Sequence, residues 1–207
     1  QPKLLTTGAG VATSLGTVQV SDVNTSDTIT ATVTAKLGNF SRAAGTDGTI
    51  ATADGVTTYT VSGTQTAVNA ALANLRYVPA TSGDTSLSLT VSEGESAVTS
   101  PLFVRVPNTA PTVTVPATAV AGTVGTAVAV SGLSVNDPDG ADSLTVTLSA
   151  ANGAKLLATA SSGVSITTIS NSQLSLQGSA AAVNSALSVL PKQMDSQAAR
   201  VMLYAIG

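Results

Sequence analysis

The run Thr66–Leu75, TAVNAALANL, returns 115 residues later as Ala181–Leu190, AAVNSALSVL, with six of ten positions identical. In each run the apolar residues recur at i, i+3, i+4 and i+7, which places them on one face of a helix. The residues on these two faces are Val68, Ala71, Leu72 and Leu75, then Val183, Ala186, Leu187 and Leu190. The sequence therefore predicts a short, core-facing helix at each run.

Polar residues beside the two runs predict how each helix is held. Thr64 or Thr66 is placed to cap the first helix, and Ser179 to cap the second, because hydroxyl oxygens accept hydrogen bonds from the first free backbone N–H groups. Asn69 and Asn184 recur next to the apolar faces. We expect these two amides to tie each helix to a neighbouring loop rather than to bind a ligand.

The same shift of 115 aligns most of the two halves without a gap. Val20–Gly38 falls on Val135–Gly153, and the last predicted strands also align. In that last stretch Leu87, Leu89 and Val91 fall on Met202, Tyr204 and Ile206. Self-similarity over such a period is the signature of tandem modules, and the sequence predicts two copies of one module.

Outside the two runs the pattern indicates β structure. Thr28–Ala35 and Ser143–Ala150 alternate apolar and polar residues, as half-buried strands do. Gly, Asn and Asp clusters separate such segments. The predicted fold is all-β: two tandem antiparallel β-sandwich modules, each with one short helix. Three prolines around Asn108 mark a stiff linker, so we place the modules at residues 1–107 and 108–207.

Composition excludes several classes of function. The net charge is −3 and the eight Lys and Arg residues are scattered, which argues against a nucleic-acid partner. The chain has no Cys, so disulfides and thiolate metal sites are excluded, and no apolar run approaches the roughly 18 residues of a membrane span. It also has no His, which removes Ser–His and Cys–His nucleophiles. We expect a protein that is not an enzyme and does not insert into a membrane.

Several motifs recur in a fixed order: an acidic turn DPDGAD (Asp137–Asp142), a strand, the AVNAAL run followed by LRYVP, a strand ending VSEG (Val91–Gly94), and NTAP (Asn108–Pro111). In this order the chain resembles the cadherin-like or immunoglobulin-like tandem repeats of large bacterial surface and secreted proteins, including adhesins of the repeats-in-toxin kind. The resemblance implies an extracellular, cell-surface stalk or spacer, with calcium at the module junctions.

The acidic turns are the candidate calcium sites. Alternate carboxylates on a tight turn converge on one ion, and calcium takes about six to eight oxygens. The chain departs from the family in its first turn, Asp22–Asp27, which has fewer carboxylates, and in having Glu93 where an Asp is common. The candidate ligands are Asp137, Asp139 and Asp142, their counterparts Asp22, Asn24 and Asp27, and Glu93 and Glu95 from the adjoining module. The alternative is that DPDG is only a favourable turn sequence with solvated carboxylates.

The alignment leaves each module short of one strand. Residues Glu93–Val115 have no counterpart in the second copy or before Gln1. They contain the closing strand of the first module, around Leu102–Val106, and the opening strand of the second, Pro111–Val115. A missing strand leaves an unpaired edge. We expect either that the chain is part of a longer repeat protein or that neighbouring repeats or like subunits add strands at these edges.

The function that these features favour is that of a structural or adhesive repeat module, a stalk or filament building block of a bacterial surface protein. One alternative is a component of a phage or appendage, such as a fibre, a decoration protein or a filament subunit on a virion or appendage surface. Another is a module that binds a carbohydrate or protein ligand. A sugar site would need exposed aromatic residues, and Tyr59 and Tyr77 lie in strand patterns.

Overall fold

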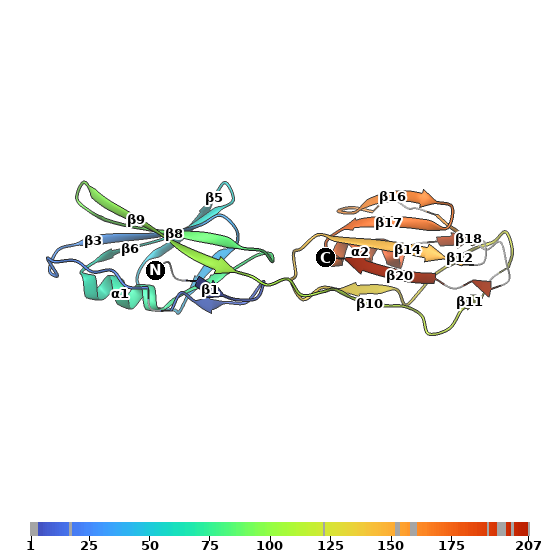
Figure 1. The fold of residues 1–207 in the computed structure, drawn as a ribbon, viewed down its shortest axis with the longest axis horizontal. Coiled ribbons are helices and arrows are strands. Elements are labelled where there is room, and N and C mark those ends of the chain that lie inside the picture. The colour runs from blue at the N-terminus through green and yellow to red at the C-terminus, as the bar shows by residue number, and fades with distance from the viewer. Residues whose placement is uncertain are drawn as a thin grey trace. The chain divides into compact units, whose positions relative to one another are not determined.

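The computed structural model describes residues 4–16, 18–121, 123–151, 154–157, 161–189, 191–193, 198–199 and 201–206. These residues form two compact units, Gln1–Asn108 (unit 1) and Thr109–Gly207 (unit 2) (Figure 1). The division falls one residue beyond the expected boundary between residues 107 and 108. No helix among the described residues is both long and apolar enough to cross a membrane.

Unit 1 contains two sheets. The larger has six strands in the order β1-β9-β8-β3-β6-β5, and the smaller has three in the order β2-β7-β4. All pairs are antiparallel except β1 with β9. The strands are β1 (Leu4–Thr6), β2 (Thr13–Ser14), β3 (Ile29–Ala35), β4 (Asn39–Arg42), β5 (Thr49–Ala53), β6 (Val56–Gly63), β7 (Leu75–Val78), β8 (Thr85–Glu93) and β9 (Ser96–Arg105).

The core of unit 1 follows directly from the period-2 pattern. Every second residue of β3, from Ile29 to Ala35, is buried. The helix α1 (Gln65–Ala73) adds Val68, Ala71 and Leu72 to the same core. Tyr59 and Tyr77 are fully buried there as well. The side chains that the sequence pattern turns inward therefore form one apolar layer between the sheets and the helix.

Unit 2 repeats this plan with smaller sheets. Its largest sheet has the order β16-β17-β14-β20, a three-stranded sheet has the order β12-β18-β15, and two pairs are β10 with β13 and β11 with β19. The strands are β10 (Thr112–Thr114), β11 (Val120–Ala121), β12 (Ala127–Ala129), β13 (Ser134–Asn136), β14 (Leu144–Ala150), β15 (Lys155–Leu156), β16 (Ser165–Ser170), β17 (Gln173–Gly178), β18 (Pro191–Gln193), β19 (Ala198–Ala199) and β20 (Val201–Ile206).

The core of unit 2 is aliphatic. β14 buries Leu144, Val146 and Leu148, and the helix α2 (Ala180–Ser188) covers them with Val183, Ala186 and Leu187. The only aromatic residue in the sequence of this unit, Tyr204, is 64% exposed. Two all-β sandwich units in tandem, each with one short helix, confirm the predicted fold class.

The two predicted helices are present, but the expected boundary of the first was wrong. Thr64 and Ser179 are the N-caps, and their hydroxyl oxygens accept hydrogen bonds from the N–H groups of Ala67 and Ala182. α1 ends at Ala73 with Asn74 as its cap, so Leu75 is not helical and instead begins β7, fully buried. α2 ends at Ser188 with Val189 as its cap, so it also stops short of the expected end, and position 190 itself lies outside the described residues.

The gapless alignment fails at the last strand. In unit 1 Leu89 of β8 lies opposite Val33 of β3. In unit 2 the residue opposite Leu148, the counterpart of Val33, is Leu203. Leu89 therefore corresponds to Leu203, a shift of 114, and not to Tyr204. A one-residue slip reverses which side chains face inward, and this is why Tyr204 is exposed although its predicted counterpart is not.

Candidate functional site

The acidic turn of unit 2 is closed by its own carboxylates. Asp137 and Asp139 are buried, with 8% and 3% of their surfaces exposed. One oxygen of Asp137, Oδ1, accepts a hydrogen bond from the backbone N–H of Asp139 at 2.9 Å. Asp139 Oδ2 accepts one from the N–H of Thr109, 30 residues earlier. These two residues thus fix the turn and fasten the beginning of unit 2 to it.

The third predicted ligand of this turn, Asp142, is half-buried and makes an interaction of its own. Among the described residues, no three Asp, Glu, His or Cys side chains are grouped as they would need to be to hold a metal ion. The structure therefore brings Asp137 and Asp139 into one turn but does not assemble Asp137, Asp139 and Asp142 into a set of three carboxylate ligands.

The acidic turn of unit 1 has the same frame with one carboxylate fewer. Asp22 Oδ1 accepts a hydrogen bond from the backbone N–H of Asn24 at 3.0 Å, and the N–H of Asp22 donates to Oε1 of Gln65 at 2.8 Å. The carbonyl of Asn24 accepts from the N–H of Asp27 at 2.9 Å, and the Asn24 side chain is exposed. The first turn is therefore closed by backbone and side-chain bonds within unit 1.

Glu93 lies against the acidic turn of its own unit. A hydrogen bond with Asp27 raises the pKa of the Glu93 carboxyl, and the negative charge of Asp22 raises it further. Glu95, two residues on in the turn between β8 and β9, is exposed. The sequence predicts that Glu93 and Glu95 contribute oxygens to the adjoining module, whereas in the structure Glu93 interacts with Asp27 and Asp22 of its own unit.

Each turn also leaves one carboxylate oxygen buried without a hydrogen bond to any of the described residues. These oxygens are Oδ2 of Asp22 and Oδ2 of Asp137, which occupy equivalent positions in the two units. A buried polar atom without a partner costs roughly 1–3 kcal/mol, and more when it is charged. Orphaned oxygens that recur at equivalent positions indicate a shared feature of the module rather than an accident of one loop.

The two helix asparagines make the same pair of bonds. Asn69 accepts from the N–H of Val20 at 2.8 Å and donates to its carbonyl at 2.9 Å. Asn184 accepts from the N–H of Val135 and donates to its carbonyl, both at 2.8 Å. Each amide thus ties its helix to the backbone just before the acidic turn, which is the structural role that the sequence analysis expected.

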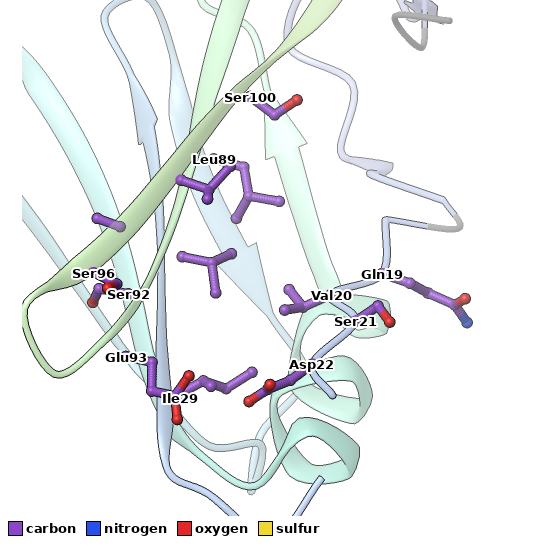
Figure 2. Close-up of a pocket in the computed structure, with 13 residues that line it drawn as sticks. Gln19, Val20, Ser21, Asp22, Ile29, Leu89, Ser92, Glu93, Ser96 and Ser100 are labelled. Atoms are coloured by element: carbon purple, nitrogen blue, oxygen red, sulfur yellow. The ribbon is translucent and has the colours of Figure 1, made fainter. Parts of the chain in front are cut away.

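Unit 1 contains a groove that the sequence analysis did not place. It has a volume of about 390 Å³ and lies between the segment Gln19–Asp22 and the strands β8 and β9. Figure 2 shows Leu89 on one side of this space and Val20 on the other, with Asp22 and Glu93 near one end. The only sign of this groove in the sequence is the stretch Glu93–Val115, which has no counterpart in the second copy under the 115-residue shift.

Tyr59 and Tyr77 are core residues and do not line the groove. Burial raises the pKa of both Tyr59 and Tyr77, with Arg42 opposing and Asp47 reinforcing the effect at Tyr59. The hydroxyl of Tyr59 donates to the carbonyl of Asp47 at 2.7 Å, and that of Tyr77 donates to the carbonyl of Leu37. Both phenols thus stay protonated and satisfied inside the core, which leaves them unsuited to nucleophilic or acid–base chemistry.

No family model and no curated protein matches the chain. Among solved structures, a chimeric titin Z1Z2 carrying a KLER peptide from decorin is 15% identical, with 84% of this chain and 85% of that chain covered and a TM-score of 0.20. A structure named BspA_C_WT is 8% identical over 86% and 75% of the two chains, with a TM-score of 0.23.

Titin domains Z1Z2 in complex with telethonin are 13% identical, with 87% of this chain and 79% of that chain covered and a TM-score of 0.18. TM-scores of this size identify no relative. The fold assignment rests on the strands, helices and cores of the two units themselves.

Proposed function

We propose that the chain is a structural repeat module of an extracellular surface protein, a stalk or filament building block of the cadherin-like or immunoglobulin-like kind. The observation that carries this proposal is the repetition of one internal frame in two units. Helix, cap, asparagine tether and acidic turn recur at equivalent positions. The polar side chains of this frame bind the backbone of their own unit, so its chemistry maintains a scaffold rather than transforms a substrate.

The aromatic residues disfavour a carbohydrate-binding module. Sugar rings stack on exposed aromatic faces, but Tyr59 and Tyr77 are fully buried and Phe40 is 6% exposed. The remaining two aromatic residues of the sequence, Phe103 and Tyr204, are exposed but lie in different units. The alternative of a virion or appendage component invokes the same scaffold, so it is separated from the cell-surface proposal by location alone.

The proposed location is tested by treating intact source cells, and separately purified virions, with trypsin and identifying the released peptides by mass spectrometry. A cell-surface module releases peptides of this chain before the cells lyse, as does a known surface protein used as a positive control. Release from virions alone favours the virion alternative. Peptides that appear only after lysis, together with a cytosolic marker enzyme, contradict both locations.

Calcium binding at the acidic turns is a second proposal, and the orphaned carboxylate oxygens favour it. Asp22 and Asp137 each hold one buried oxygen without a hydrogen-bond partner among the described residues. A hard cation would satisfy such an oxygen. In unit 2 the carboxylate ligands are Asp137 and Asp139, and in unit 1 the carboxylate ligand is Asp22. One or two carboxylates correspond to weak binding, on the order of 10⁻⁴–10⁻³ M.

The calcium proposal is tested by thermal unfolding in millimolar calcium and in chelator. At ten times the dissociation constant, binding stabilises the folded state by about 1.4 kcal/mol. The variant Asp137→Asn keeps the size of the side chain and an acceptor for the N–H of Asp139, so it folds but loses the calcium response of unit 2. Identical melting curves with calcium and chelator, for wild type and variant alike, leave the acidic turns as structural turns only.

A further inference from the structure

The groove of unit 1 occupies the place that a strand fills in unit 2. There, β10 pairs with β13 and also lies beside β20. The counterpart of β13 in unit 1 is Gln19–Ser21, and the counterpart of β20 is β8, as the strand registers show. These two segments are the opposite walls of the groove. Among the described residues of unit 1, no strand stands between them.

The backbone along the groove has free hydrogen-bonding groups. Val20 and Val135 use both their N–H and C=O to bind the helix asparagine. Because successive residues of an extended chain point their polar groups to opposite sides, Ser134 and Asn136 bond to β10. Gln19 and Ser21 are their counterparts. Their backbone groups have no hydrogen-bond partner within the described part of the chain.

The side chains in the groove favour a strand of alternating apolar residues. Leu89 and Val91 of β8 are only half-buried, although they belong to the inward-facing set, and Ile29 also lines the groove. The counterpart of Leu89 in unit 2, Leu203, is 9% exposed. β9 adds a further wall that unit 2 lacks among its described strands. A strand bound here would therefore be covered on more sides than β10 is.

We infer that this groove is an acceptor site for an extended peptide strand of the β10 type, supplied by a neighbouring repeat module. The strand runs antiparallel to Gln19–Ser21, with the residue equivalent to Val113 opposite Val20 and the flanking residues paired with Gln19 and Ser21. This inference names the partner of the structural module proposed above and rests on that proposal for its source, although the groove itself does not depend on it.

The test uses the full 207-residue chain and a synthetic peptide of its own sequence, Asn108–Pro116 (NTAPTVTVP), with hydrogen exchange as the readout. At saturating peptide, we expect the amides of Gln19 and Ser21 to exchange at least about tenfold more slowly, because each gains a backbone partner. Peptides N-methylated at Thr112 and Thr114 lose these donors, and a Val113→Asp peptide loses the apolar contact. Both control peptides should bind at least about tenfold more weakly.

A second experiment attaches the β10 sequence covalently to the chain. Because Gln1 is the counterpart of Pro116, the sequence NTAPTVTV fused directly before Gln1 has the spacing of the repeat. The fusion should protect the amides of Gln19 and Ser21 from exchange without added peptide, and it should raise the melting temperature of unit 1. A fusion that carries Val113→Asp in the added copy alone should do neither.

Two outcomes overturn the inference. One is unchanged exchange at Gln19 and Ser21 in both experiments. The other is protection confined to β20, which pairs only with β14 among the described strands and is the competing edge for strand addition. Neither outcome alters the release of surface peptides from intact cells, so a failure here is distinguishable from a failure of the proposed function.

Discussion

The two units share a frame but differ in the strands at their borders. Unit 1 has β9 beside β8 and a groove in the place of β10. Unit 2 has β10, and β20 is paired only with β14 among the described strands. Both units nevertheless enclose a core of the same central strands and helix. The helix and the central strands therefore define the module, and the border strands are the parts that differ between the two units.

The cores themselves are filled differently. Tyr59 of β6 corresponds to Leu174 of β17, as the registers with Val33 and Leu148 show. In unit 1 the rings of Phe40 and Tyr77 also meet, with centroids 5.8 Å apart. Aromatic rings bury more apolar surface than aliphatic side chains, so single core substitutions should separate the two units most clearly.

The largest effect is expected for Tyr59→Ala. It removes a fully buried ring and the hydrogen bond to the carbonyl of Asp47, so unit 1 should lose about 3–5 kcal/mol of unfolding free energy. Leu174→Ala at the equivalent position should cost unit 2 about 2–5 kcal/mol. Urea unfolding followed by hydrogen exchange assigns each transition to its unit.

Tyr59→Phe is the matched control, because it keeps the ring and removes only the hydroxyl, at a cost of about 1 kcal/mol. If Tyr59→Ala cost no more than Tyr59→Phe, the ring would not be packed as the structure shows. If Tyr59→Ala shifted the transition of unit 2, the two units would not unfold separately.

The next effect concerns the helix asparagines. Asn69→Ala and Asn184→Ala each leave the N–H and C=O of a buried valine without their partner, so each should cost about 2–4 kcal/mol. The two variants should differ in the hydrogen-exchange rates of the segments that the asparagines hold. Residues 134–136 remain paired with β10, whereas within the described part of unit 1 residues 19–21 have only the tether. Asn69→Ala should therefore release its segment into fast exchange, and Asn184→Ala should not.

Asn74→Ala serves as the control for these variants. Asn74 is an exposed asparagine whose amide donates only to the carbonyl of Ala70, one helical turn earlier. Its replacement should change the unfolding free energy by no more than about 0.5 kcal/mol. Equal exchange of residues 19–21 and 134–136 in the two tether variants would contradict the view that unit 1 lacks a strand at this place.

A smaller and symmetrical effect is expected at the N-caps. Thr64 and Ser179 accept from the N–H three residues on, at 3.4 Å in both units. Thr64→Ala and Ser179→Ala should each cost about 1 kcal/mol, and Thr64→Ser should be nearly neutral. Thermal unfolding of the three variants checks this. A cost at one cap and none at the other would show that the two helices are not held alike.

The parts of the fold that repeat in the sequence were predictable, because helical spacing and period-2 alternation report local structure. Leu75 was assigned to the helix because it lies at i+7 from Val68, on the apolar face. The first residue of a buried strand is also apolar, so the sequence pattern does not distinguish the two cases. The register of β20 was wrong by one because a single missing residue in a connection leaves no mark in the apolar pattern. Strand pairing, a long-range property, reveals it.

The candidate site shows the same limit. The sequence located the acidic turns and the asparagines, but the partners of Asp139 and Asn69 are backbone groups of Thr109 and Val20, which carry no side-chain signal. The only indication of the groove in the sequence was the segment Glu93–Val115, which has no counterpart in the second copy. Its walls became identifiable once β8 and Gln19–Asp22 were placed opposite each other.

The smallest expected effect is electrostatic and belongs to unit 1 alone. Glu93 shares a hydrogen bond with Asp27 and feels the charge of Asp22, so its pKa in the folded state lies above the ordinary value of 4.5. The folded state then binds the Glu93 proton more tightly than the unfolded state does, and unit 1 gains stability as the pH falls through this raised pKa. Above that pKa the ionised carboxylate disfavours folding.

Glu93→Gln removes this penalty while keeping the shape of the side chain. The urea midpoint of unit 1 should therefore rise slightly at pH 7 relative to wild type, and the difference should shrink towards zero as the pH falls below the ordinary glutamate range. High salt should reduce the difference as well, because salt screens the repulsion between the carboxylates. Under the 114-residue shift of the last strand, the position of unit 2 that corresponds to Glu93 is Gly207, so the midpoint of unit 2 should be the same in the variant and in wild type at every pH. A lower midpoint of unit 1 at pH 7 in the variant, or a difference independent of pH, would mean that Glu93 supports the acidic turn rather than being repelled by it.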